Sequence, residues 1–133
     1  MIDVVAAIAL KGSKVLIARR ANNQSLPGKW EFPGGKIEAE ETPKESLERE
    51  IEEEFGVKSE VGAHLTSVEH DYGNFSIRLH AYFVTLQIEP AQSSDHDKIE
   101  WVEVENILRL DLAEADIPIA QSLQNAIAKK WIH

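Results

Sequence analysis

Three glutamates in a short acidic segment have the spacing of a shared metal site. Glu50, Glu53 and Glu54 are three and four residues apart, so a helix through them carries all three on one side. Like charges at these spacings repel each other, and a site that keeps them together usually has a cation between them. Clustered carboxylate oxygens suit hard ions such as Mg²⁺ or Mn²⁺. The alternative is a solvated acidic helix face without a ligand.

A glycine pair ahead of this segment offers a further source of oxygen ligands. Gly34 and Gly35 follow a short apolar stretch, residues 30–32. Paired glycines permit a tight turn and a close approach of the backbone to a ligand. We therefore expect a glycine turn that brings a backbone carbonyl oxygen onto the same metal ion. An ordinary surface turn is the alternative.

Together, these residues resemble the Nudix box of the MutT-like hydrolases. The family pattern is a glycine, five residues, a glutamate, seven residues, Arg-Glu, an apolar residue, any residue, Glu-Glu, any residue, a glycine and an apolar residue. The chain fills every fixed position with Gly35, Glu41, Arg49, Glu50, Ile51, Glu53, Glu54, Gly56 and Val57. Outside the box, residues 2–8, 30–36 and 115–118 look like the branch that contains CTP pyrophosphohydrolases and the MutT enzymes that cleave 8-oxo-dGTP.

The resemblance implies a role for each of these polar residues. The expected metal ligands are the carbonyl of Gly34, the carboxylates of Glu50, Glu53 and Glu54, and Asp95 from a late loop. Arg49 is expected to pair with and orient the glutamates, and Glu41 to fix the loop ahead of the helix. Asp95 stands where relatives commonly have a longer glutamate before a histidine. His96, which follows it here, is expected to be a surface residue.

The reaction implied is the hydrolysis of a nucleoside triphosphate to its monophosphate and pyrophosphate. Metal ions neutralise the phosphate oxygens, and a glutamate accepts a proton from water. Glu50 is favoured as this base and Glu53 is second, since the spacing does not choose between them. Two other functions stay open. One is cleavage of a dinucleotide such as ADP-ribose or a diadenosine polyphosphate, with Tyr72 in the relevant region; the other is a non-catalytic nucleotide-binding module.

Three further residues are expected to bind the substrate. Arg20 stands at a position that contacts substrate in MutT-like enzymes. Phe32, together with Val4, offers an apolar slot for the base, although both also suit a plain core. Asp116 replaces an asparagine of the guanine-oxide-specific enzyme. An ionised aspartate only accepts hydrogen bonds, which favours a CTP-type substrate without excluding oxidised purines. A helix cap is the other interpretation of Asp116.

A capped amphipathic helix is expected to position the glutamates. Thr42 and Glu45 form a capping box, and Gly56 follows the last turn of a helix over residues 43–55. Apolar residues recur every four positions along it, at Leu47, Ile51 and Phe55. Strands are expected over residues 4–10 and 15–20 as a hairpin, then over 60–69, 77–88 and 99–104. A closing helix over residues 118–132 would bury Ile119, Leu123, Ile127 and Trp131. This order predicts an α/β protein, the Nudix α/β/α sandwich with a mixed sheet between helices.

Composition limits the remaining classes. The 133 residues fit a single domain over residues 1–133. Fourteen Lys and Arg against 23 Asp and Glu give a net charge of −9, which disfavours a nucleic-acid polymer as partner. The longest apolar run, residues 4–10, is too short to cross a bilayer, and no signal peptide is expected. The absence of cysteine suits a cytoplasmic protein. A monomer and a homodimer are both compatible with the sequence.

Overall fold

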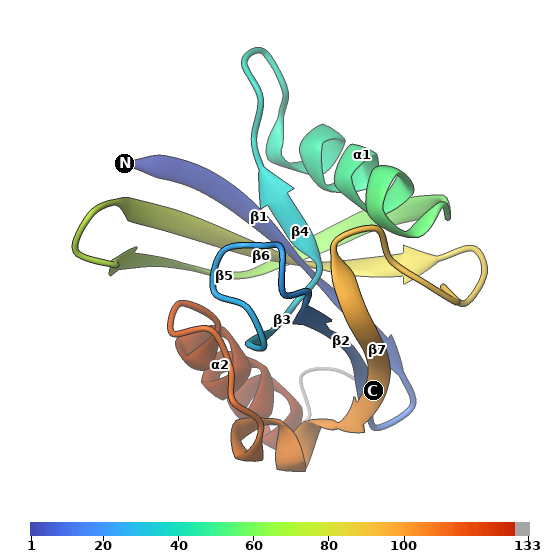
Figure 1. The fold of residues 1–133 in the computed structure, drawn as a ribbon. Coiled ribbons are helices and arrows are strands. Elements are labelled where there is room, and N and C mark those ends of the chain that lie inside the picture. The colour runs from blue at the N-terminus through green and yellow to red at the C-terminus, as the bar shows by residue number, and fades with distance from the viewer. Residues whose placement is uncertain (130–133) are drawn as a thin grey trace.

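A mixed β-sheet lies between helical layers in the computed structural model, which describes residues 1–129 (Figure 1). The elements are β1 Ile2–Lys11, β2 Lys14–Arg20, β3 Trp30–Glu31, β4 Gly34–Lys36, α1 Pro43–Phe55, β5 Ser59–Asp71, β6 Ser76–Leu86, β7 His96–Glu103, the 3₁₀ helix η1 Val104–Arg109 and α2 Asp116–Ala128. The expected α/β/α sandwich is confirmed, and the predicted strands are all present. Helix α2 starts two residues earlier than expected, whereas its predicted end at residues 130–132, with Trp131, lies outside the described residues.

Strand β1 connects the two parts of the sheet. It pairs in parallel with β6 from Ile2 to Ala9. On its other edge it pairs antiparallel with β4 and then, beyond a short gap, with β2. Strand β2 continues into antiparallel pairs with β3 and β7. The predicted hairpin of β1 and β2 is confirmed, but only the residues next to its turn are paired across it.

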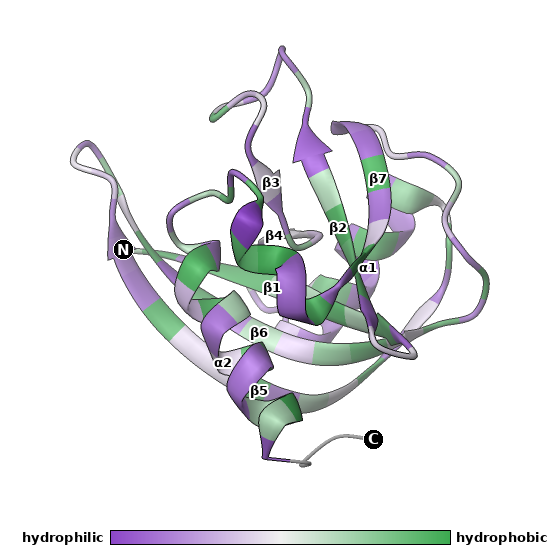
Figure 2. Cartoon of the chain, turned by 90° about the horizontal axis from the view of Figure 1, so that it is seen from below, coloured by the Kyte–Doolittle hydropathy of each residue, from purple (hydrophilic) through white to green (hydrophobic). Residues whose placement is uncertain are grey.

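Alternate residues of β1 pack against different helices. Val5 and Ala7 belong to the apolar cluster under α1, whereas Ala6 and Ile8 belong to the cluster under α2. This is why β1 is apolar almost throughout, as its green colour in Figure 2 shows. The predicted helix stripes are confirmed: Leu47, Ile51 and Phe55 are buried on α1, and Ile119 and Leu123 on α2, with Ile127 partly buried beside them.

Helix α1 is fixed at both ends as its sequence predicts. The Thr42 hydroxyl accepts from the Glu45 N–H at 3.1 Å, and the Glu45 carboxylate accepts from the Thr42 N–H at 2.9 Å. Gly56 ends the helix with φ at 70°. The buried Ser46 hydroxyl donates to the carbonyl of Lys36 at 3.2 Å, which joins the helix to β4. Within the described residues, no helix is long and apolar enough to cross a membrane.

The predicted glycine turn is wrong, because Gly34 and Gly35 form strand β4. Neither glycine has a positive φ. Both lie in close approach. A Cβ atom on Gly34 would collide with the backbone carbonyl of Val5, so glycine is required there, and one on Gly35 would displace the carboxylate of Glu50. The absence of side chains therefore lets a strand pass between β1 and α1.

Replacement of Gly34 by alanine should destabilise this junction. The added methyl group meets backbone rather than a movable side chain, so β1 and β4 must separate. Overpacking of this kind costs roughly 1–3 kcal/mol or more. We expect urea denaturation to give at least that loss for Gly34→Ala. Gly62→Ala in β5 is the control, since its new methyl group would make only an ordinary contact with Phe83. Equal stability of the two variants would contradict the close-approach argument.

Candidate active site

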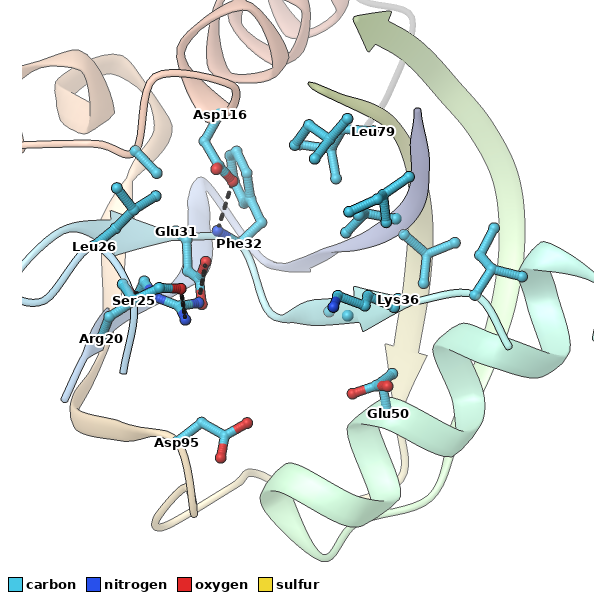
Figure 3. A pocket seen from close by; sticks show the side chains of 18 of the residues that line it. Arg20, Ser25, Leu26, Glu31, Phe32, Lys36, Glu50, Leu79, Asp95 and Asp116 are labelled. Carbon is cyan, nitrogen blue, oxygen red and sulfur yellow. Dashed lines mark hydrogen bonds and ion pairs between the residues drawn. The ribbon is translucent and has the colours of Figure 1, made fainter. Parts of the chain in front are cut away.

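A cavity of about 750 Å³ brings most of the predicted site residues together. Its volume lies within the roughly 300–1,000 Å³ that is usual for small-molecule sites. The predicted residues that line it are Arg20, Phe32, Gly34, Glu50, Glu54, Asp95 and Asp116. Figure 3 shows Glu50 and Asp95 facing the cavity from opposite sides, with Phe32 and Asp116 together at its other end. Arg49 and Glu53 are not part of the lining.

The carboxylate of Glu50 lies directly against strand β4. It occupies the space beside Gly35 that a side chain would otherwise fill. Burial raises the pKa of Glu50, and this effect outweighs the opposing hydrogen bond and charge of Arg49. Glu50 is therefore a more basic carboxylate than an exposed one, and it faces the cavity next to a backbone without side chains.

Arg49 joins the loop before α1 to the glutamates on the helix. Its Nε donates to Glu41 at 2.6 Å, and its Nη1 donates to Glu50 at 2.9 Å and to Glu53 at 3.1 Å. A further bond to the carbonyl of Lys36, at 3.1 Å, reaches β4. The Arg49 guanidinium lowers the pKa of Glu41 to about 2. Glu41 also accepts from a backbone N–H of its own loop, so its position is that of a structural anchor.

Glu54 and Asp95 form the most strongly perturbed part of the cavity wall. The Glu54 side chain belongs to a residue only 9% exposed, and its Oε2 atom has no hydrogen-bond partner. Burial, followed by the adjacent carboxyl of Asp95, raises the pKa of Glu54 to about 10. The backbone N–H of Ser94 donates to the carbonyl of Glu54 at 3.0 Å, which holds this loop against the helix. Two acidic groups thus lie together without a basic partner among residues 1–129.

The predicted ligands do not yet converge on one point. Among residues 1–129, no group of three or more His, Asp or Glu side chains is close enough to hold an ion together. Glu53 is the clearest departure, because its 60% exposed side chain turns toward Arg49 instead of the cavity. Glu50, Glu54 and Asp95 nevertheless line the same cavity as Gly34.

A second polar wall contains Arg20 and two residues that sequence reasoning missed. Arg20 Nη1 donates to both oxygens of Glu31, at 3.0 and 2.9 Å. Glu31 also contacts His96 Nε2 at 2.9 Å. The expectation that His96 is a surface residue is wrong, since its side chain is 1% exposed. The signal in the sequence is a charged residue between two aromatic residues, Trp30 and Phe32. Successive side chains of a strand point to opposite faces, so Glu31 faces away from the side that Trp30 packs on.

The far end of the cavity is apolar except for Asp116. Phe32 is buried there, and its backbone N–H donates to Asp116 Oδ1 at 3.1 Å. Burial, followed by the charge of Glu31, raises the pKa of Asp116 well above its usual range. This shift disfavours the ionised, accept-only aspartate that the sequence analysis expects, and a neutral carboxyl both donates and accepts. Asp116 does not cap α2: Ala115 is the N-cap residue and no side chain caps it.

Tyr72 lies beside this end of the cavity and is tied to α2. Its hydroxyl oxygen accepts from the N–H of Ala115 at 3.1 Å, and its ring stacks on Phe75 with 5.1 Å between centroids. Burial raises the pKa of the Tyr72 hydroxyl. The side chain thus fixes the β5–β6 turn over the cavity, and this contact alone accounts for a tyrosine at that position.

A family model and two proteins of known sequence are similar to this chain over most of its length. The family model of the NUDIX domain matches residues 4–122. A CTP pyrophosphohydrolase of Escherichia coli (strain K12) is 37% identical over 122 residues, which cover 92% of this chain and 90% of that protein. An 8-oxo-dGTP diphosphatase of the same strain is 28% identical over 120 residues, which cover 90% of this chain and 93% of that protein.

Solved structures agree with the sequence relatives. The solution structure of the E. coli ORF135 protein matches with a TM-score of 0.81 at 34% identity, covering 97% of this chain and 92% of that one. The solution structure of MutT from methicillin-resistant Staphylococcus aureus 252 matches with a TM-score of 0.75 at 40% identity, covering 93% and 95%. Since the domain model, the sequence relatives and the folds all coincide with the complete glutamate motif, the chain belongs to the Nudix family of hydrolases.

Proposed function

We propose that the protein is a metal-dependent nucleoside triphosphate pyrophosphohydrolase, which converts a (deoxy)nucleoside triphosphate and water to the monophosphate and pyrophosphate. The observation that carries the proposal is one cavity with acidic groups at one end and an apolar base-sized slot at the other. CTP-type pyrimidine nucleotides or oxidised purine nucleotides are the proposed substrates, in keeping with the names of the relatives. Its proposed place of action is the cytoplasm, where it would remove unwanted nucleotides.

The acidic end fits a divalent cation, which Nudix hydrolases generally need. The unpartnered Oε2 of Glu54 and the uncompensated contact between Glu54 and Asp95 are what a missing cation would leave. Glu50, Glu54, Asp95 and the carbonyl of Gly34 are the proposed ligands, and Glu53 joins them if it leaves Arg49. An all-oxygen donor set favours Mg²⁺, with Mn²⁺ as a substitute. The bound ion would screen the triphosphate charge and make water a stronger acid.

The chain's own residues supply the remaining chemistry. Glu50 is the proposed general base, because it faces the cavity from the helix that carries the other acids. Glu53 is less suited to that role while it is exposed and paired with Arg49. Arg49 would hold Glu50 in position through the 2.9 Å contact. Lys36, which points into the cavity in Figure 3, brings a positive charge toward the phosphates.

Base recognition is proposed for Phe32 and Asp116. Phe32 and Val4 offer apolar contact, and the Asp116 oxygen that is not bound to the Phe32 N–H is available to the base. A neutral Asp116 resembles an asparagine, since it can donate as well as accept. This widens the proposed substrates, because either a cytosine or an oxidised guanine edge could then be matched. Arg20 is the proposed contact at the neighbouring polar wall.

The proposed reaction is tested by the bond that is cut. Phosphorus NMR of a panel of canonical and oxidised triphosphates with Mg²⁺ should show monophosphate and pyrophosphate as primary products. Glu50→Gln should lower kcat by at least about a hundredfold, as loss of a general base does, and EDTA should stop the wild type. Glu52→Gln is the matched control, since Glu52 pairs with Lys58 on the solvent side of the same helix. Diphosphate plus orthophosphate, or full activity of Glu50→Gln, would refute the proposal.

A pH series should reveal the strain at Glu54. Its pKa rises from the ordinary 4.5 to about 10 on folding, so the folded protein binds a proton that the unfolded chain releases. The contribution of Glu54 to the stability of the metal-free protein is therefore fully present below about pH 4.5 and is lost as the pH rises toward 10. Glu54→Gln should gain melting temperature relative to wild type across that range, and Mg²⁺ should remove the gain. A difference that does not change with pH would contradict the prediction.

Asp116 should affect the choice of base more than the chemistry. Asp116→Ala leaves the buried Phe32 N–H and the base without a partner, which costs about 1–3 kcal/mol, or roughly ten- to a hundredfold in kcat/KM for the preferred nucleotide. Asp116→Asn keeps a donor and an acceptor and should retain activity within about tenfold. The comparison is of kcat/KM across the nucleotide panel. An equal loss for every nucleotide would show that the base is recognised elsewhere.

A further inference from the structure

His96 links two parts of the cavity wall that are far apart in the sequence. Its Nε2 contacts Glu31 Oε2 at 2.9 Å, and its Nδ1 contacts the Ser93 hydroxyl at 2.7 Å. The same hydroxyl oxygen accepts from the backbone N–H of Asp95 at 3.2 Å. One imidazole thus stands between the wall that carries Arg20 and the loop that carries Asp95.

For a neutral His96 ring, the partners determine the direction of these hydrogen bonds. A carboxylate only accepts, so the Nε2 atom that faces Glu31 carries a proton. In the neutral imidazole Nδ1 is then an acceptor, and the Ser93 hydroxyl donates to it. That leaves the Ser93 oxygen free to accept from Asp95 N–H. One tautomer of His96 therefore satisfies every contact in the hydrogen-bonded series Asp95–Ser93–His96–Glu31.

Burial makes this arrangement rigid. The His96 side chain is 1% exposed, and its ring stacks on Phe55 with 5.9 Å between centroids and 11° between planes. Water therefore cannot readily replace either of its partners, and loss of one leaves a buried polar atom unpaired. Because Phe55 is the last residue of α1, the ring is also held by the helix that carries the glutamates.

The Glu31 side of the link fixes a guanidinium. Arg20 donates to both Glu31 oxygens, to the carbonyl of Ser25 and to the Ser25 hydroxyl, the last at 3.1 Å. Glu31, Arg20 and Ser25 all line the cavity, whereas His96 does not. His96 can therefore influence a bound nucleotide only through the groups that it holds.

We propose that His96 is a positioning residue that holds the Glu31–Arg20 pair and the Asp95 loop in a fixed relation across the cavity. The proposal rests on the proposed function, in which Arg20 contacts the nucleotide and Asp95 the cation. The two ring nitrogens have separate roles. Nε2 supports nucleotide binding through Glu31, and Nδ1 supports cation binding through Ser93 and Asp95.

Two isosteric changes separate these halves. His96→Gln places an amide N–H near the position of Nε2 and loses the acceptor for Ser93. His96→Asn places an amide near the position of Nδ1 and loses the donor to Glu31. Ser93→Ala breaks only the cation side, at a half-buried residue, and so tests the same link if the His96 variants fold poorly. Mn²⁺ binding is measured by electron paramagnetic resonance, and KM and kcat are measured at saturating Mg²⁺.

The two classes of variant should affect different quantities, Mn²⁺ affinity in one class and KM in the other. His96→Gln and Ser93→Ala should weaken Mn²⁺ binding by about tenfold, as loss of a group behind a metal ligand does, with KM for the nucleotide near wild type. His96→Asn should raise KM by about tenfold with Mn²⁺ binding unchanged. Nitrogen NMR of the wild-type ring should show a protonated Nε2 and an unprotonated Nδ1.

Separate effects on Mn²⁺ affinity and on KM distinguish a positioning residue from one that only supports the fold. If all three variants weaken Mn²⁺ binding and raise KM by the same factor, or if none changes either, the inference is overturned. The opposite tautomer in the NMR spectrum would also overturn it. Failure of the proposed function is recognised separately, because it would appear as wild-type protein that releases no pyrophosphate. The Mn²⁺ and NMR measurements do not depend on turnover and would still test His96.

Discussion

The close approach of strand β4 to its neighbours is the constraint on which the site depends. Gly34 and Gly35 let this strand lie against β1 on one side and against the Glu50 carboxylate on the other. The buried Ser46 and the guanidinium of Arg49 then hold α1 onto the carbonyl of Lys36. The helix that carries the glutamates is therefore positioned by two of its side chains, which bind the backbone of β4, while Glu50 and Glu54 line the cavity.

Charge is compensated unevenly around that helix. Arg49 neutralises its outer acids, Glu41 and Glu53, and reaches Glu50. The inner pair, Glu54 and Asp95, has no such basic partner among the described residues, and burial followed by the adjacent Asp95 raises the pKa of Glu54. A sequence optimised only for stability would have an apolar or amide side chain in place of one of these acids. The presence of both acids in one wall points to a site in which function and stability conflict.

Much of this could be predicted from the sequence because the signals are local. The caps of α1 and the apolar stripes of both helices act over a few residues, and each was confirmed in the structure. The glutamate motif is equally local, but its role as a metal site stays a prediction. Strand β4 was mistaken for a turn because three residues are too few to show a period, and its glycines suit both forms. His96 and Glu31 were missed because their contact spans 65 positions. The raised pKa of Asp116 follows from burial, which no local pattern reveals.

The parallel pairing of β1 with β6 has a consequence for biosynthesis. Since Ile2 pairs with Ile77, about 75 residues must be made before this apolar strand can meet its partner. At the usual rate of about 5–20 residues per second, that interval is roughly 4–15 s. Strand β4 is completed much sooner and pairs with the opposite edge of β1. The glycine strand can thus cover part of one edge of β1, at Val4 to Ala6, before the partner on the other edge has been made.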